Sequence, residues 1–258
     1  MFIDTHAHLY VDDYKDDLHH VVQQSKSNNV AKVILPNIDE STIVPLNKLT
    51  QDYPDFFLPM MGLHPTSIKE DFKKQLDIIY DELCSKDGYV AVGEIGIDLY
   101  WDTTFINEQT EAFETQLRWS IEKDLPVSIH SRNSYKEIMQ SLRRVGEKRL
   151  RGVFHSFSGN ANDLKELSAF KNFYFGINGV VTFKNSSLST VLKECPLKRI
   201  VLETDSPYLT PVPFRGKRNS PEYLSHISHT LSEIYNINPK DIARVTKTNA
   251  VQIFGLNI

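Results

Sequence analysis

The stretch Met1-Phe2-Ile3-Asp4-Thr5-His6-Ala7-His8 opens the chain and decides both the predicted fold and the predicted site. Its apolar start predicts a short buried strand, and the two histidines follow where that strand ends. Residues i and i+2 of a strand point the same way, so we expect the imidazoles of His6 and His8 to project side by side. Neutral imidazole nitrogens are good ligands for divalent metal ions. A His-x-His pair on its own is more often structural, so the metal interpretation depends on similar residues later in the chain.

Length and composition indicate one globular α/β domain that covers residues 1–258. The chain is 40% apolar with a formal charge of −4, and it has no run near the roughly 18 apolar residues of a membrane span. The N-terminus lacks the features of a signal peptide, and Cys84 and Cys195 have no CxxC spacing, so we expect a cytoplasmic protein with free thiols. The slight acidity does not by itself indicate a nucleic-acid-binding protein, but a local basic patch would be enough for binding.

Short β-rich runs alternate with amphipathic stretches along the whole chain. In one of these stretches, Glu108 to Ile121, apolar residues recur every four positions, which predicts a helix. Eight nearly continuous apolar strands, each followed by a helix, predict a single (β/α)8 TIM barrel. A doubly wound open sheet is the competing architecture, and the absence of a Gly-x-Gly-x-x-Gly turn after the first strand disfavours its dinucleotide-binding form. We expect the strands near Phe2–Thr5, Lys32–Leu35, Phe57–Met61, Tyr89–Val92, Val127–Ile129, Gly152–Phe154, Phe173–Gly176 and Ile200–Leu202.

Metal-ligand residue types follow these strands repeatedly. In a barrel the carboxyl ends of the strands converge on one mouth, where such proteins keep their active sites. Each residue alone has an ordinary structural explanation, but together they indicate a metal centre, because buried carboxylates and imidazoles need partners. The residues at predicted strand ends are His6, His8, His64, Glu94, His130, His155, Glu203 and Asp205.

The number of candidate ligands favours two metal ions, because a mononuclear catalytic zinc site uses only three protein ligands. We expect Glu94 to bridge the ions and Asp205 also to act as general base, while water between the ions would become a nucleophile near neutral pH. The first ion would be completed by His6, His8 and Asp205, and the second would be held by His130 and His155.

Several segments together resemble the TatD family of metal-dependent deoxyribonucleases, within the metallo-hydrolase superfamily of (β/α)8 barrels. The similarity runs from end to end. It implies metal ligands at His6, His8, Glu94, His130, His155 and Asp205, and a magnesium-supported 3′-to-5′ exonuclease activity on DNA, preferably single-stranded. In one departure from the family pattern, Leu99 stands where a ring is usual. The matching segments are Phe2 to His8, Gly62 to Pro65, Ala91 to Asp98, Pro126 to Arg132, His155 to Gly159, Leu202 to Leu209 with Pro211 to Asn219, and Asn249-Ala250.

Further residues near the predicted mouth are candidates for substrate contact. Arginine suits phosphate because its planar fork donates two hydrogen bonds, and exposed rings can stack on bases. We expect phosphate contacts from Arg132, Arg215, Lys217 and Arg218, base stacking by Tyr100 and Trp101, and phosphate contact or support of the ligands by His64 and Glu203.

The leading hypothesis is therefore a two-metal hydrolase acting on phosphodiester bonds at DNA strand ends, with RNA as a second candidate substrate. We expect Mg²⁺ for activity, although the ligand types also accept Zn²⁺, Mn²⁺ or Ni²⁺. We expect a monomer with no membrane association. A small-molecule metallohydrolase, an amidase or deaminase, is the first alternative, because one scaffold can host several chemistries. The second is a nucleic-acid-binding or scaffold protein with a structural metal, which the carboxylate-rich ligand set disfavours.

Overall fold

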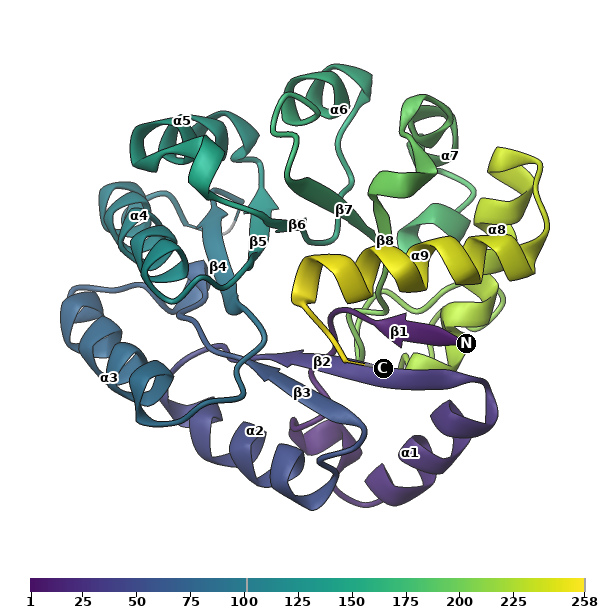
Figure 1. Ribbon diagram of the computed structural model, residues 1–258, viewed down its shortest axis with the longest axis horizontal. Coiled ribbons are helices and arrows are strands. Elements are labelled where there is room, and N and C mark those ends of the chain that lie inside the picture. Colours follow the sequence, from purple (N-terminus) through teal and green to yellow (C-terminus); the bar gives the residue numbers. More distant parts are fainter. Residues whose placement is uncertain (101, 258) are drawn as a thin grey trace.

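The computed structural model describes residues 1–100 and 102–257, and over these residues it contains eight parallel strands, each followed by helical segments (Figure 1). The strands are β1 (Phe2–Asp4), β2 (Val30–Pro36), β3 (Phe57–Met60), β4 (Val92–Asp98), β5 (Val127–Arg132), β6 (Gly152–Phe154), β7 (Phe173–Ile177) and β8 (Ile200–Leu202). The α-helices are α1 (Leu18–Ser27), α2 (Glu40–Asp52), α3 (Phe72–Ser85), α4 (Ile106–Glu122), α5 (Tyr135–Val145), α6 (Ala161–Leu167), α7 (Leu188–Val191), α8 (Leu224–Tyr235) and α9 (Pro239–Phe254). The predicted parallel α/β architecture is confirmed, and the helix expected at Glu108 to Ile121 lies within α4.

The strands follow one another in chain order, as the predicted barrel requires. They form a sheet of β1-β2-β3 and a sheet running from β4 to β8. Isolated parallel bridges connect the two sheets at both junctions, between Ala7 and Ser206 and between Met61 and Val92. Figure 1 shows the strands arranged in a ring with β4 and β8 on opposite sides. This order differs from that of the doubly wound sheet, in which the strand order reverses at a switch point.

Helix α9 covers one end of this ring (Figure 1). Its Ile253 and Phe254 belong to a buried apolar cluster together with Ile3, Ile34 and Val201, which come from β1, β2 and β8. The helix begins at Pro239, and the side chain of Asn238 accepts a hydrogen bond from the Lys240 amide as an N-cap. The candidate histidines and acids are not members of this apolar cluster, which lies under α9.

Two strands depart from their predicted bounds by three residues or more at one or both ends, whereas the other six agree to within two residues at each end. The expected strand Tyr89–Val92 is wrong, because β4 begins at Val92 and continues to Asp98, so Glu94 lies within the strand rather than after it. Likewise β5 extends through His130 to Arg132. The strands continue through polar residues because β4 and β5 pair along residues 95–98 and 129–132. Their polar side chains find partners inside the ring, which an apolar run in the sequence cannot reveal.

Gly96 allows β4 and β5 to lie this close together. A Cβ atom placed on Gly96 would lie 1.9 Å from the carbonyl oxygen of His130, so any larger residue would force the strands apart. The glycine thus helps to set the position of His130 relative to Glu94. Among the described residues, no helix combines the length and the apolar character needed to cross a bilayer.

Candidate metal centre

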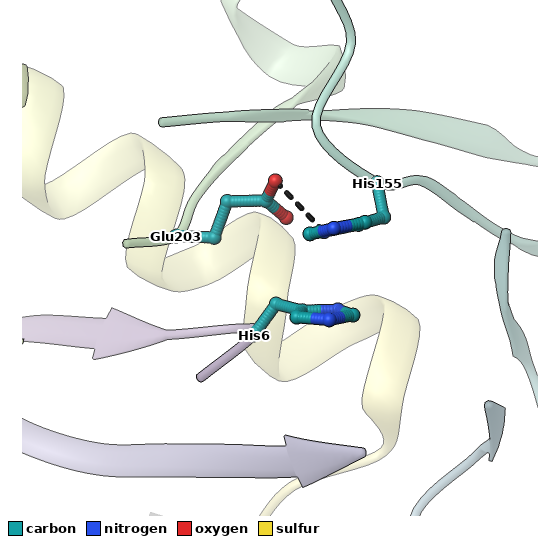
Figure 2. Close-up of side chains that lie close together, drawn as sticks. All are labelled: His6, His155 and Glu203. Carbon is teal, nitrogen blue, oxygen red and sulfur yellow. Dashed lines mark ion pairs between the residues drawn. The ribbon is translucent and has the colours of Figure 1, made fainter. Parts of the chain in front are cut away.

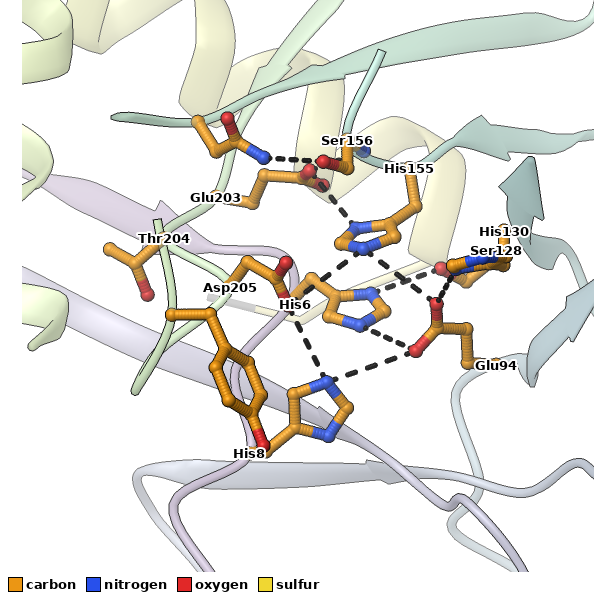
Figure 3. Close-up of polar contacts among 12 residues, drawn as sticks. His6, His8, Glu94, Ser128, His130, His155, Ser156, Glu203, Thr204 and Asp205 are labelled. Atoms are coloured by element: carbon orange, nitrogen blue, oxygen red, sulfur yellow. Dashed lines mark hydrogen bonds and ion pairs between the residues drawn. The ribbon is translucent and has the colours of Figure 1, made fainter. Parts of the chain in front are cut away.

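The carboxylate of Glu94 lies at the middle of a cluster of imidazoles (Figure 3). Its side chain is 3% exposed, because β4 carries it into the interior of the ring. Each of its oxygens faces more than one imidazole. From Oε2, the distances are 3.1 Å to His6 Nε2 and 3.8 Å to His8 Nε2; from Oε1, they are 2.8 Å to His130 Nδ1, 3.3 Å to His64 Nε2 and 3.7 Å to His155 Nε2.

Asp205, which follows β8, completes the cluster on its other side. Its Oδ1 lies 3.5 Å from His8 Nε2 and 3.8 Å from His155 Nε2, so these two nitrogens lie near both Asp205 and Glu94. The Asp205 side chain is 15% exposed, which makes it more open to solvent than Glu94. Asp205 is therefore placed to contact both the ligand nitrogens and water.

Three of the histidines have an acceptor on the outward ring nitrogen. His130 Nε2 lies 2.9 Å from Asp98 Oδ2, and His155 Nδ1 lies 3.0 Å from Glu203 Oε1 (Figure 2). His8 Nδ1 lies 3.1 Å from the hydroxyl of Tyr10, whose own proton is donated to the carbonyl of Pro36. In the neutral imidazole the hydrogen bonds of His130 and His8 hold the proton on the outward nitrogen. His155 Nδ1 makes no hydrogen bond among the described residues, and only the nearby charge of Glu203 favours a proton there. The inward nitrogen then presents a lone pair to the centre, which is the form that binds a metal.

His64 differs from those three histidines. Its Nδ1 accepts a hydrogen bond from the backbone N–H of Thr66 at 3.2 Å, and an N–H group can only donate. Burial lowers the pKa of His64 below its usual value, so the neutral ring predominates at neutral pH. The proton of that ring is then on Nε2, which faces Glu94 and His130. In this tautomer His64 is oriented as a hydrogen-bond donor at the centre, and its Nε2 could bind an ion only after losing that proton.

Glu203 lies on the Nδ1 side of His155, opposite the Nε2 atom that faces Glu94 and Asp205. Its side chain is 1% exposed, and Oε1 also accepts a hydrogen bond from the Ser156 amide at 2.6 Å. A Cβ atom on Gly176 would lie 2.1 Å from Glu203 Oε2, so β7 leaves just enough room for the carboxylate. Of the two roles expected from the sequence, this burial favours support of a ligand histidine over contact with substrate.

The imidazole rings of His6 and His155 are stacked face to face. Their ring centroids are 3.4 Å apart with an interplanar angle of 17° (Figure 2). His6 Nδ1 contacts the hydroxyl of Ser128 at 3.3 Å, which fixes the ring while Nε2 faces Glu94. Two stacked imidazoles repel each other when both are positively charged. Burial together with the charge of His155 therefore lowers the pKa of His6.

The electrostatics follow from this packing. Burial alone would raise the pKa of Glu94, but the surrounding histidines outweigh burial and hold it well below its usual value. Burial would lower the pKa of His155 and His130, yet the neighbouring carboxylates raise it to about 10 and about 9 respectively. Without a metal ion, the cluster therefore holds ionised acids beside protonated imidazoles.

The cluster offers three groups of atoms that could hold a divalent ion. Within each group the ligand atoms lie within 4.8 Å of one another: His6, His155 and Glu203; His6, His8 and Asp205; and His64, Glu94 and His130. Among the described residues, the ion pairs of Glu94, Glu203 and Asp205 are all with histidines, so no lysine or arginine neutralises them. Buried carboxylates without such partners fit divalent cations.

Sequence reasoning assigned no role to several supporting residues. Asp98 orients His130, Ser128 and Tyr10 contact His6 and His8, and Asp4 accepts hydrogen bonds from Thr204 N–H at 2.9 Å and Thr204 Oγ1 at 2.6 Å. A signal for Asp98 was present, because positions i and i+4 of a strand share a face and Glu94 is four residues earlier. The other contacts join segments up to 200 residues apart.

The predicted substrate residues are placed differently from one another. Tyr100 is exposed and the guanidinium of Arg132 lies 3.7 Å from its ring centroid, beside the end of β4. Trp101 lies outside the described residues. Arg215 is exposed and stacks 3.8 Å over the ring of Phe183.

The remaining two cations of that loop have different neighbours. Lys217 is exposed, with its ammonium 5.7 Å from the ring centroid of Phe214. Arg218 pairs with Asp17 through two contacts of 2.9 Å and 2.5 Å and also donates to the carbonyl of Asp13. Its donors tie the loop to the start of α1, so its phosphate contact stays a prediction that requires this pair to open.

Comparisons with known proteins point to one family of metal-dependent hydrolases. A family model described as TatD related DNase matches residues 3–255. The chain is 35% identical over 258 residues to the Bacillus subtilis protein named "Uncharacterized metal-dependent hydrolase YabD", with 100% of both chains covered. The crystal structure of YjjV, a TatD homologue from Escherichia coli, has a TM-score of 0.92 at 28% identity and covers 99% of this chain and 98% of that one. A TatD family hydrolase from Entamoeba histolytica shares the fold, with a TM-score of 0.83 at 21% identity and coverage of 98% and 97%.

Proposed function

This chain belongs to the TatD-related DNase family of metal-dependent hydrolases, and on that premise we propose that it hydrolyses phosphodiester bonds of DNA. We propose a 3′-to-5′ exonuclease that acts on single-stranded ends, with RNA as the less favoured substrate. One observation carries the proposal: the buried carboxylate of Glu94 lies among imidazoles, three of which have an oxygen atom within 3.1 Å of the outward nitrogen. Such a donor set is suited to divalent ions and to hydrolytic chemistry.

We propose that this set of donors holds two divalent ions. We propose that His6, His8 and Asp205 hold one ion, that His130 and His155 hold the other, and that Glu94 is shared between them. Bound ions of this kind supply Lewis-acid catalysis at phosphoryl oxygens and lower the pKa of water in the site. Mg²⁺ is the expected ion, and Zn²⁺, Mn²⁺ and Ni²⁺ suit the same ligand types.

Two further residues have roles of their own in the proposed reaction. The neighbouring histidines hold the pKa of Asp205 below its usual value despite burial, so its carboxylate is ionised at neutral pH and can accept the proton of the attacking water. His64 offers Nε2–H at the centre, and we assign it a hydrogen bond to a phosphoryl oxygen. Both assignments depend on contacts that fix the side chain before substrate arrives.

The surrounding surface supplies contacts for a nucleic acid. Arg132 and Tyr100 lie together beside the end of β4, and Arg215 and Lys217 are exposed on the loop after β8. Guanidinium groups bind phosphate through paired hydrogen bonds, and an exposed ring stacks on an unpaired base. A single strand presents both its phosphates and its bases, which is why we propose it as the substrate.

We also propose that the enzyme acts as a cytoplasmic monomer. Cys84 and Cys195 are free thiols, and a reducing compartment would keep them so. Size-exclusion chromatography with light scattering of the purified protein tests the proposed oligomeric state directly.

Incubation of the metal-loaded protein with end-labelled single-stranded DNA tests the nuclease proposal. With a 5′ label we expect a ladder that shortens progressively, and with a 3′ label we expect immediate release of mononucleotide. Chelator should stop both reactions, and a His130→Ala variant should lose activity. RNA of the same sequence should be cut more slowly.

The same experiment separates the proposal from a small-molecule hydrolase. If wild-type protein with Mg²⁺, Mn²⁺ or Zn²⁺ leaves the DNA intact while hydrolysing amide or deaminating small substrates, the nuclease proposal is wrong. If the His130→Ala variant keeps full turnover, the metal centre is not the site of the chemistry.

A further inference from the structure

Two aromatic side chains stand out by their exposure. Among the Phe, Tyr and Trp side chains that the structure describes, only Tyr100 and Tyr208 are exposed, at 54% and 58%. Tyr100 comes two residues after Asp98 at the end of β4, and Tyr208 comes three residues after Asp205 beyond β8. Single exposed rings are unremarkable on a protein surface, but here both follow strands that lead into the same centre.

The turn that carries Tyr208 is held firmly. Asp205 and Leu209 both have positive φ values, 58° and 55°, which residues other than glycine rarely adopt and which persist only where the surroundings impose them. The Asn219 side chain donates hydrogen bonds to the carbonyls of Tyr208 at 2.6 Å and Thr204 at 2.8 Å. The backbone N–H of Tyr208 bonds to the carbonyl of Asp205 at 2.8 Å. The exposed ring is therefore presented by a fixed backbone.

Tyr208 lies beside the proposed ligands. Its ring centroid is 6.3 Å from that of His8, at an interplanar angle of 62°. Tyr100 follows β4, which lies on the opposite side of the ring from β8 (Figure 1). The guanidinium of Arg132, 3.7 Å from the Tyr100 ring centroid, adds a cation on that side. The two exposed rings therefore follow strands that enter the centre from opposite sides.

We propose that Tyr208 stacks on a nucleobase, so that Tyr208 and Tyr100 bind the two nucleosides on either side of the phosphate that is cut. This inference rests on the proposed nuclease function and names a specificity residue for it. Stacking does not depend on base identity, because every base has a π-face. It does require unpaired bases, so this pair of rings would select single strands over duplexes.

Variants of Tyr208 test the stacking. Tyr208→Ala should lower kcat/KM on single-stranded DNA by about 5- to 150-fold, mainly through KM, as loss of one stacked base does. Tyr208→Phe should restore nearly all of it, because the ring is kept, whereas Tyr208→Leu should behave like Tyr208→Ala. Val212→Ala is the matched control, since Val212 is also exposed, at 40%, on the same loop. Melting temperatures should be the same for all variants.

Oligonucleotides that lack one base locate the two contacts. An abasic site at the terminal or the penultimate nucleoside should remove the penalty of Tyr208→Ala at one position and that of Tyr100→Ala at the other. On intact DNA the two penalties should multiply in the double variant, because each ring binds a different base. A binding measurement complements the kinetics: 2-aminopurine at the Tyr208-sensitive position should be quenched by wild-type protein and not by Tyr208→Ala.

Several results would overturn the inference. Unchanged kcat/KM for Tyr208→Ala would do so, as would one abasic position that removes both penalties. Failure of wild-type protein to cut DNA would instead contradict the proposed function. In that case quenching of 2-aminopurine still decides the inference, and no quenching by the metal-loaded wild-type protein would reject it.

Discussion

At the residue scale, the two oxygens of Glu94 face different histidines: Oε2 faces the two that follow β1, and Oε1 faces those that follow β3, lie in β5 and follow β6. We expect Glu94→Gln to reduce both metal content and kcat on DNA by more than the roughly 10–100-fold typical of losing a residue that only orients a ligand. An amide cannot supply the charge that both groups of ligands share. Metal analysis of the purified variant, together with its turnover, checks this prediction.

Asp98 provides the comparison, because it contacts the outward nitrogen of His130 and is not itself among the proposed ligands. Asp98→Asn should lose about 10–100-fold in metal affinity or activity, less than Glu94→Gln. Glu82→Gln is the control, since Glu82 is a hydrogen-bonded carboxylate away from the centre, paired with Tyr89 and Asn47. If Glu94→Gln were no more damaging than Asp98→Asn, the shared-ligand role of Glu94 would be wrong.

The raised pKa values of His130 and His155, about 9 and about 10, predict a pH dependence of metal uptake. At pH 7 both rings hold a proton in the metal-free chain, and a ligand nitrogen must lose it before binding. We expect metal affinity to rise with pH between 7 and 9 and up to two protons to be released per chain. Calorimetry in buffers with different ionisation enthalpies counts the released protons.

The same two pKa values set the sign of the effect on stability without metal. Both lie above the usual histidine value of 6.5, so the folded chain holds these protons more tightly than the unfolded chain. Their contribution to stability is complete below pH 6.5 and is lost as the pH rises through 9 to 10. Metal affinity that did not change between pH 7 and 9 would contradict the raised pKa values of His130 and His155, on which both predictions rest.

At the scale of the elements, the sequence predicted where the functional side chains lie better than it predicted the strand ends. The family resemblance and the strand-end pattern both placed Glu94 and His130 in the centre, yet β4 and β5 run through these residues rather than stopping before them. Polar residues inside a strand look like an interruption when the sequence is read alone. They are accommodated because each has a partner from another strand, and such long-range partners leave no local signal.

The loop after β8 gives a second prediction at this scale, because its arginines are placed differently. Arg215→Ala should weaken binding to single-stranded DNA and lower the slope of log affinity against log salt by about 0.7, as loss of one phosphate contact does. Arg218→Ala should leave that slope unchanged and lower the free energy of unfolding by about 0.2–1 kcal/mol, since its pair with Asp17 is partly exposed.

Fluorescence anisotropy across a salt series and denaturant melts of both variants provide the measurements. The two arginines lie three residues apart on one loop, so each variant is the control for the other. Equal salt slopes for wild type and Arg215→Ala would remove this arginine from the proposed DNA surface. A lowered slope for Arg218→Ala would mean that its contact with Asp17 opens to receive DNA.

At the scale of the whole molecule, the ring of strands brings together residues from His6 to Asp205, while α9 and its apolar cluster cover the other end. The fold class followed from the alternation of apolar runs and amphipathic stretches, because that pattern is a property of the whole chain. What could not be predicted was which supporting residue each histidine would contact. Those contacts depend on the register of neighbouring strands, which is set by tertiary packing and leaves no local signal in the sequence.

The separation of the proposed metal centre from the apolar clusters predicts how the protein responds to metal removal. The apolar clusters do not include the proposed ligands, so the chelated protein should stay folded and keep its secondary structure. It should nevertheless melt at a lower temperature, because each ion that binds only to the folded chain stabilises it by about 2.7 kcal/mol at 100 times its dissociation constant. For a chain of this size that amounts to a drop of about 5–10 °C for each ion removed. Calorimetry with and without chelator measures it, and the Glu94→Gln variant should show a smaller difference. Equal melting temperatures for the loaded and chelated wild-type protein would show that the buried acids and imidazoles are neutralised among themselves, without a metal.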